Sequence, residues 1–318
     1  MNDILGGLLN CKSHGVIVGP GDDAGVYRLK SDLLVETVDV ITPIVDDPYT
    51  FGAICAANSV SDIYAMGGTP RTALAILGYA TCDFGPAVIR KLLKGAVDKL
   101  NEAGACLIGG HSIEDNEFKL GFAITGVVER KHLLKAGGAK KGDILILTKK
   151  IGTGILTSAV KLGKARESDL KPVIKSMLAL NKTASKAAAS AGANAATDVT
   201  GFGLLGHALN IAKSSKADLV IHSVKVPLMK NVKKMIASGI IQKGARKSLS
   251  YVSTETEFPD NFSETDKMAL VDPQTSGGLL ISLPAKGLNK FDRIMKKDRH
   301  PYWVIGEVVK GRGKIIIR

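Results

Sequence analysis

The stretch TVDVITPIVDDPYTFGAICAANSVSDIYAMGGTP (residues 37–70) contains a strand pattern followed by a helix pattern. The strand is the apolar run 33–40, in which every second side chain shares one face. Asp47-Pro48 then places a carboxylate N-cap before a proline in the first helical turn. Gly67-Gly68 ends this apolar segment, so we expect one helix over residues 48–66.

Strand and helix patterns alternate in both directions from this stretch. They predict an α+β (mixed α/β) fold in two domains, comprising residues 1–130 and 140–318, with a linker or turn around 130–141. The expected strands are 72–79, 105–108, 119–129, 142–149, 218–222 and two near the C-terminus; the expected helices include 85–103, 154–163, 170–191 and 286–297.

The charge of the chain is unevenly distributed. The net charge is +13, yet residues 1–62 hold nine Asp or Glu and only three Lys or Arg. Basic residues are scattered through the remainder, and only 5% of the chain is aromatic, so stacking platforms for bases are sparse. We therefore expect a solvated basic surface and no nucleic-acid partner.

The apolar runs, the first residues and the cysteines indicate the cellular compartment. No apolar run reaches the ~20 residues of a membrane span, and the first residues lack a secretory pattern. The four cysteines are at positions 11, 55, 82 and 106, and no two of them form a CxxC pair. This spacing disfavours a structural zinc site or a disulfide framework. We expect a cytoplasmic protein without a membrane anchor.

Adjacent acids occur in the glycine turn GDDAG (21–25). Asp22 and Asp23 repel each other unless a cation lies beside them, and Mg²⁺ prefers such oxygen ligands. An exposed turn explains the same residues without a ligand, since Asp and Gly are common turn formers.

Two further segments place polar groups among apolar ones. Asp39 stands near the end of a mostly apolar strand, where a site residue and a helix cap are both common. Asn58 and Asp62 are four residues apart on the expected helix and share one face. They form either a polar helix face or an inward-facing pair that needs a metal or a partner.

Two glycine-containing segments follow expected strands. TDVTGFG (197–203) leads into a helix, so Asp198 and Thr200 either cap that helix or accompany a phosphate and its metal. Gly110, His111 and Ser112 offer backbone and side-chain donors of a similar kind. The chain has no GxxxxGK[ST] and no GxGxxG opening a βαβ unit, which together indicate metal-dependent phosphoryl transfer without a P-loop.

The motifs resemble those of the selenophosphate synthetase (selenide, water dikinase) family in order and spacing, from about residue 18 to the C-terminus. The same superfamily includes aminoimidazole ribonucleotide synthetase and thiamine-monophosphate kinase. The segments that carry the resemblance are GDDAGVYRL (21–29), residues 37–78, GGHSIEDNE (109–117), LTKKIGTGIL (147–156), TDVTGFGLLGHALNIA (197–212) and DPQTSGGLLI (272–281).

This resemblance implies an ATP-dependent phosphotransferase that converts ATP, selenide and water to selenophosphate, AMP and phosphate with Mg²⁺. It implies a homodimer whose N-terminal domains pair into a β-barrel, with ATP near the interface. By motif, the metal ligands are Asp23, Asp39, Asp62 and Asp198. The implied nucleotide contacts are Pro20, Gly21, Asp22, Asp39, Asn58, Gly110, His111 and Ser112, the last three in a loop from the partner subunit.

The start of the chain departs from the family pattern. The family's catalytic Cys or selenocysteine and its Lys are expected upstream of Met1, so no catalytic residue is assigned here, and Cys11 is interpreted as an ordinary loop cysteine. Two alternatives remain open: a catalytically silent ATP-binding relative that acts through partners, and a sister enzyme such as thiamine-monophosphate kinase.

Overall fold

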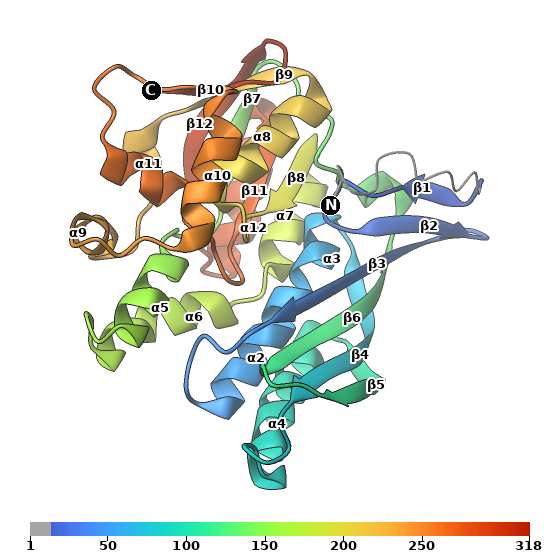
Figure 1. The fold of residues 1–318 in the computed structure, drawn as a ribbon. Helices are drawn as coiled ribbons and strands as arrows, with labels where there is room; N and C mark the ends of the chain where they lie inside the picture. The colour runs from blue at the N-terminus through green and yellow to red at the C-terminus, as the bar shows by residue number, and fades with distance from the viewer. Residues whose placement is uncertain (1–13) are drawn as a thin grey trace.

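The computed structural model describes residues 14–318 and contains two sheets, each with its own helices (Figure 1). The first sheet has the order β1-β2-β3-β6-β4-β5, antiparallel except for the pair β4–β5. Its strands are β1 Val16–Val18, β2 Gly25–Leu29, β3 Asp32–Ile41, β4 Thr69–Tyr79, β5 Cys106–Glu114 and β6 Lys119–Val128. β5 is therefore an edge strand that pairs only with β4.

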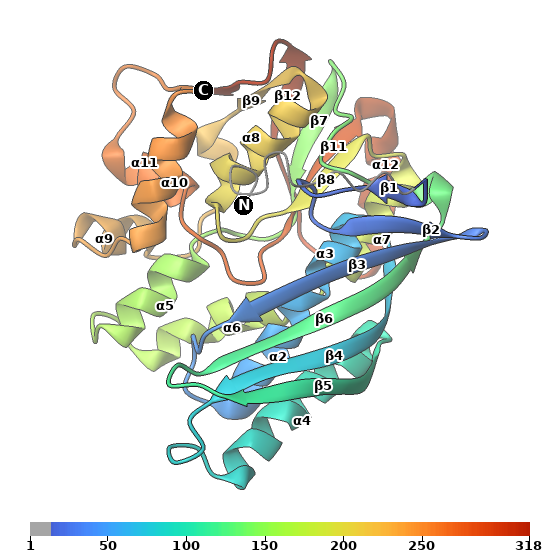
Figure 2. The same ribbon diagram turned by 45° about the vertical axis from the view of Figure 1, so that its right-hand side comes forward.

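Helices cover one face of this sheet, and Figure 2 shows the other face uncovered by helices. They are α2 Pro48–Ser59, α3 Ser61–Ala65 and α4 Pro86–Ala103. Asp47 caps α2 as expected, accepting a hydrogen bond from the Thr50 backbone N–H at 2.9 Å. The single helix predicted over 48–66 is wrong in one respect, because it is interrupted at Val60.

Glycine permits the close approach of α2 to α4. A Cβ at Gly52 would lie 2.0 Å from the Leu92 carbonyl oxygen, and a Cβ at Gly95 would lie 2.0 Å from the Tyr49 carbonyl oxygen. Each helix thus presents a glycine to the backbone of the other. The apolar side of the pair packs on the sheet in a core that includes Phe51, Phe122 and Ile124.

The second sheet has the order β10-β13-β9-β12-β7-β11-β8. Its strands are β7 Asp143–Leu147, β8 Ala195–Asp198, β9 Ala217–Ile221, β10 Thr256–Glu257, β11 Leu279–Pro284, β12 Trp303–Lys310 and β13 Ile315–Ile317. The central strands are almost wholly apolar; Leu145, Leu280 and Ile305, for example, are fully buried. Such continuous apolar strands are typical of a sheet covered on both faces.

Helices flank the second sheet on both sides. They are α5 Thr153–Lys161, α6 Lys171–Leu178, α7 Lys182–Ala191, α8 Gly203–Ser215, α9 Val232–Ala237, α10 Lys243–Ser253, α11 Glu264–Leu270 and α12 Leu288–Lys297, with 3-10 turns η1 Arg130–His132, η2 Glu167–Leu170, η3 Ser223–Lys225 and η4 Ala285–Gly287. The helical stretch expected over 170–191 is two helices, separated after Leu178. In the described part of the chain, no helix is long and apolar enough to cross a membrane.

Candidate metal and nucleotide site

Four aspartates from separate segments come together where the two domains meet. Asp23 follows β1 in the turn before β2, Asp39 lies near the end of β3, and Asp62 lies on α3. Asp198 is the last residue of β8, in the second sheet. Figure 1 shows α3 beside β8 at this junction, and the two elements are in contact. The cluster therefore contains residues of both domains.

The first sheet and its helices fix two of these carboxylates through short hydrogen bonds. Thr37 Oγ1 donates to Asp62 Oδ2 at 2.5 Å, and Asn58 Nδ2 donates to Asp39 Oδ2 at 2.7 Å. Thr37 and Asp39 are two residues apart on β3, so they share the face that α2 and α3 cover. Although the helix is broken at Val60, Asn58 and Asp62 still point to the same side of the strand.

The four carboxylates disfavour one another's ionisation. Burial and, next, the negative charge of Asp198 raise the pKa of Asp39 to about 6, whereas the hydrogen bond from Asn58 acts in the opposite direction. Burial, followed by the charge of Asp198, also holds the pKa values of Asp23 and Asp62 well above the usual range. Burial raises the pKa of Asp198 itself. Such mutual repulsion is relieved when a cation neutralises the carboxylates.

Two carboxylate oxygens support a cation at this position. Asp23 Oδ2 and Asp198 Oδ2 are buried and have no hydrogen-bond partner among the described residues. A buried ionised oxygen without a partner is costly, whereas a coordinated metal ion satisfies it. All the oxygens in the cluster are hard ligands, as Mg²⁺ prefers. The residues present therefore fit a magnesium site.

The turn before β2 fastens the cluster to the second domain. Asp22 accepts hydrogen bonds from the Ala136 backbone N–H at 3.1 and 3.2 Å, and Asn210 Nδ2 donates to the Gly21 carbonyl at 3.4 Å. Gly21 has a φ of 110°, and Pro20 forms an isolated bridge with Asp22. Pro20, Gly21 and Asp22 are thus held at the edge of the acidic cluster, with their chain path set by the other domain.

His207, on α8, is a site residue that the sequence analysis missed. One of its ring nitrogens lies within 4.8 Å of a carboxylate oxygen of Asp23 and of one of Asp198. The Thr200 backbone N–H donates to His207 Nε2 at 3.1 Å, so Nδ1 bears the proton of the neutral ring and faces Thr197 Oγ1 at 3.3 Å. Burial lowers the pKa of His207 to about 4, which keeps the ring neutral.

This arrangement makes His207 a positioning residue rather than a ligand. Thr197 Oγ1 accepts from His207 and donates to Asp23 Oδ1 at 2.7 Å. Both ring nitrogens are engaged, and the hydrogen bonds run from the α8 segment to a carboxylate of the other domain. The pattern Thr-x-x-Thr followed seven residues later by His could have signalled the connection.

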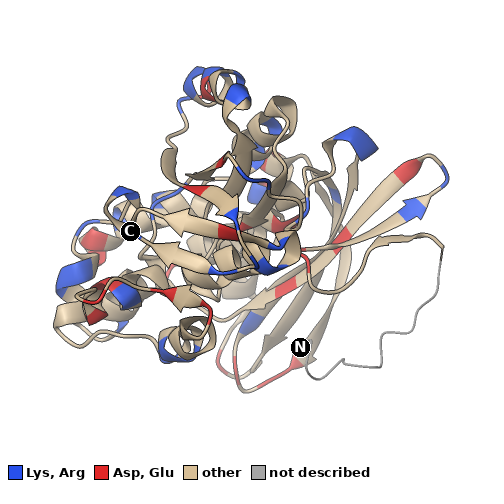
Figure 3. Ribbon diagram, turned by 90° about the horizontal axis from the view of Figure 1, so that it is seen from above, with Lys and Arg blue, Asp and Glu red and all other residues tan. Residues whose placement is uncertain are grey.

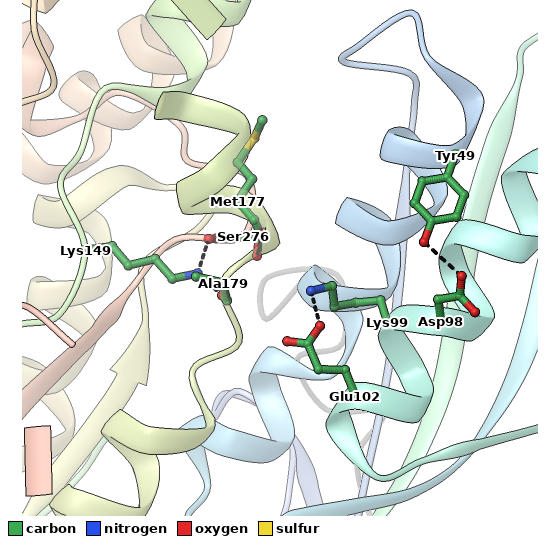
Figure 4. A network of polar contacts seen from close by, with 8 residues as sticks. All are labelled: Tyr49, Asp98, Lys99, Glu102, Lys149, Met177, Ala179 and Ser276. Atoms are coloured by element: carbon green, nitrogen blue, oxygen red, sulfur yellow. Dashed lines mark hydrogen bonds and ion pairs between the residues drawn. The ribbon is translucent and has the colours of Figure 1, made fainter. Parts of the chain in front are cut away.

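The segment 272–281 contacts Asn58 and Lys149 beside the acidic cluster. Asn58 Oδ1 accepts from the Ser276 backbone N–H at 2.9 Å, at a residue with a φ of 48°. Lys149 is buried and donates through Nζ to the carbonyls of Ala179 at 2.6 Å and Ser276 at 2.8 Å, as Figure 4 shows. Burial lowers the pKa of Lys149 to about 7, with the charge of Asp198 acting in the opposite direction.

The predicted loop around Gly110, His111 and Ser112 is wrong as a description of local structure. These residues lie inside β5, opposite Ala75, Ile76 and Leu77 of β4. They are exposed, and among residues 14–318 no hydrogen bond joins them to the aspartates. A Cβ at Gly110 would lie 2.3 Å from the Ala75 carbonyl oxygen, so the glycine serves strand pairing.

The helix caps suggested for Asp39, Asp198 and Thr200 are not present in the structure. α8 begins at Gly203 after Phe202, without a side-chain cap, so neither Asp198 nor Thr200 caps it. Asp47, not Asp39, caps α2. Cys11 lies outside the described residues.

Comparison with known proteins agrees with the two-domain fold. The family model described as "AIR synthase related protein, N-terminal domain" matches residues 21–128, and its C-terminal counterpart matches residues 140–318. Among solved structures, thiamine monophosphate kinase from Aquifex aeolicus superposes with a TM-score of 0.69 at 19% identity, covering 94% of this chain and 91% of that one. The hydrogenase maturation protein HypE of E. coli gives 0.62 at 16% identity, covering 92% and 86%. The two family models, together with the fold, thus identify the chain as an AIR-synthase-related protein.

Relatives in sequence identify one family within the AIR-synthase-related proteins. A protein named selenide, water dikinase from Clostridioides difficile is 44% identical over 290 residues, which cover 90% of this chain and 83% of the relative. Another with that name, from Myxococcus xanthus, is 42% identical over 314 residues, covering 97% and 89%. The chain belongs to the selenide, water dikinase family.

Proposed function

We propose that this protein is an ATP-dependent phosphotransferase that forms selenophosphate, AMP and phosphate from ATP, selenide and water. The observation that carries the proposal is the convergence of four aspartates, with two buried oxygens lacking a partner, in a chain of this family. A site that must hold a polyphosphate without a P-loop needs metal ions in place of the missing lysine.

In this proposal Asp23, Asp39, Asp62 and Asp198 hold Mg²⁺. When bound, Mg²⁺ would neutralise phosphate charge and orient the oxygens for transfer. Asp23 is kept in position by Thr197, and Asp39 is kept in position by Asn58. Asn58 is itself anchored on the Ser276 backbone, so the carboxylates are pre-oriented before substrate arrives.

The nucleotide is assigned to the edge of this cluster. Pro20, Gly21 and Asp22 form the turn that faces it, and Asp22 is fixed by Ala136. Gly110, His111 and Ser112 are assigned to the ATP site of the partner subunit, because they lie on the exposed edge strand of the first sheet. Three described cysteines, including buried Cys55, are free thiols, which supports a cytoplasmic setting.

The uncovered face of the first sheet supports the proposed homodimer. Val38 and Leu74 are 58% and 45% exposed, and Ile113 on β5 is 52% exposed. The strand registers place all three on the face opposite α2 and α4, together with His111. An exposed apolar sheet face next to an open edge favours association, and we propose that pairing two such sheets closes a barrel.

The dimer is tested by sedimentation velocity on a Val38→Lys/Leu74→Lys variant. We expect the parent chain to sediment as a dimer and the variant as a monomer. The control is Val224→Lys, since Val224 is 92% exposed on the second domain. A dimer that survives both introduced lysines would contradict this surface.

The reaction is tested by phosphorus NMR with ATP, Mg²⁺ and selenide under reducing conditions. We expect a selenophosphate resonance with AMP and phosphate, and its loss in Asp62→Asn. Glu36→Gln is the matched control, because Glu36 also lies on β3 but is exposed on the opposite face. ATP binding without any turnover would favour the silent relative, and turnover stimulated by thiamine monophosphate would favour the sister kinase.

A further inference from the structure

A large cavity with a basic lining lies in the second domain, outside the acidic cluster. Its volume is about 960 Å³, and eight Lys or Arg side chains line it, against a single acidic residue, Asp169. Sites for small molecules commonly have volumes of ~300–1,000 Å³. Figure 1 shows α5, α6 and α9 grouped in this part of the molecule.

The basic side chains come from different walls of the cavity. Lys164 and Arg166 follow α5, Lys175 lies on α6, Lys234 lies on α9, and Arg299 follows α12. Among the eight, within residues 14–318, only Arg166 has a carboxylate partner, Asp169, at 3.7 Å. Figure 3 shows Lys and Arg on many helices. Eight of these residues line this one cavity. Such convergence of like charges attracts anions.

The cavity also offers an apolar surface. Trp303, at the start of β12, lines it together with Pro301 and Met235. Trp303 is the single tryptophan of the chain and is half-buried. An aromatic face beside a cluster of cations suits a ligand with a ring at one end and phosphate at the other.

The segment 272–281 separates this cavity from the aspartates. Lys149, which lines the cavity, donates to the Ser276 carbonyl. The Ser276 N–H donates to Asn58, which contacts the acidic cluster. Asn181, which also lines the cavity, donates to Ser61 Oγ at 2.9 Å, next to Asp62. The two sites thus share a wall but differ in charge, since one requires a cation and the other provides cations.

We propose that this cavity is a second binding site, which holds a nucleotide by its phosphate without a metal ion and by its base against Trp303. The buried ammonium of Lys149 uses two of its three donors on carbonyls, so one remains for the ligand. This inference is independent of the proposed reaction, because the binding it describes requires neither Mg²⁺ nor turnover.

The test is AMP binding in EDTA, followed by the fluorescence of Trp303 and by equilibrium dialysis. We expect one AMP per chain, a change in Trp303 emission and an affinity that falls with salt. Lys164→Glu/Lys234→Glu should weaken binding at least about tenfold. The control Lys247→Glu/Lys290→Glu changes the net charge equally but alters exposed residues outside the cavity, and it should bind like the parent.

A second comparison separates this site from the acidic cluster. Asp62→Asn should leave AMP binding in EDTA within about twofold of the parent, even though it abolishes the proposed reaction. Loss of binding in Asp62→Asn, equal weakening by the control pair, or no saturable binding would each overturn the proposal. Inorganic phosphate that binds as tightly as AMP would overturn the assignment of a nucleotide.

Discussion

His207 illustrates how a neutral ring can position a carboxyl group. Its ring accepts a hydrogen bond from the Thr200 backbone N–H and donates one to Thr197, which in turn donates a hydrogen bond to Asp23. Because the backbone N–H of Thr200 is a fixed donor, the orientation of every group along this path is determined. The carboxylate is therefore positioned from the other domain.

Replacing this ring should weaken metal binding without removing a ligand. We expect His207→Ala to lower the affinity for Mn²⁺, used as a probe for Mg²⁺, by roughly 10–100-fold, as measured by electron paramagnetic resonance. His207→Gln, whose amide has both an acceptor and a donor, should recover part of the loss. His222→Ala is the control, and an unchanged affinity in His207→Ala would contradict the positioning role.

At the scale of elements, the α2–α4 pair depends on two glycines. A methyl group at Gly52 would meet the Leu92 carbonyl, a backbone atom that cannot move alone. We expect Gly52→Ala to lower the free energy of unfolding by about 1–3 kcal/mol, as measured by urea denaturation. Gly85→Ala is the control, since nothing lies within 4 Å of a Cβ there; because Gly85 is the N-cap of α4, we expect a loss of at most about 1 kcal/mol.

Such an effect should extend to the site, because α2 carries Asn58. If Gly52→Ala displaces α2, the Asn58–Asp39 hydrogen bond should lengthen and the Mn²⁺ affinity should fall together with stability. A destabilised variant with unchanged Mn²⁺ affinity would show that the break at Val60 isolates the site from strain within α2.

Elements with strong local signals were predictable, and those decided by tertiary contacts were not. The cap at Asp47, the strand containing Asp39 and the acidic turn at 21–25 have local residue patterns, and the structure contains each. Gly110 was misinterpreted because a glycine needed for close strand pairing has the same local pattern as one needed for a turn. Lys149 escaped notice because its burial depends on segments more than a hundred residues away.

The whole molecule should show a stability that depends on pH and metal in a linked way. Asp39 has a pKa of about 6 in the fold against 3.8 ordinarily, so the folded state binds its proton more tightly than the unfolded chain. The metal-free protein should therefore lose stability as pH rises from about 4, and the part contributed by Asp39 should be lost once the pH has passed about 6.

Magnesium should reverse this trend, because it replaces the protons. In thermal melts at pH 5, 6 and 7.5, we expect Mg²⁺ to raise Tm most at pH 7.5 and least at pH 5. Asp39→Asn in EDTA should flatten the fall between pH 4 and 6, whereas Glu36→Gln should not. A Tm increment from Mg²⁺ that is equal at all three pH values would contradict linkage through these carboxylates.

The division of the aspartates between domains has a mechanical consequence. Asp23, Asp39 and Asp62 belong to the first domain and Asp198 to the second, so their repulsion acts across the junction and tends to push the domains apart. The hydrogen bonds from Ala136 to Asp22 and from Thr197 to Asp23 oppose that force. A divalent ion bound among these carboxylates would attract all four of them and so hold the two domains together. Metal binding and closer association of the domains would then occur in one step.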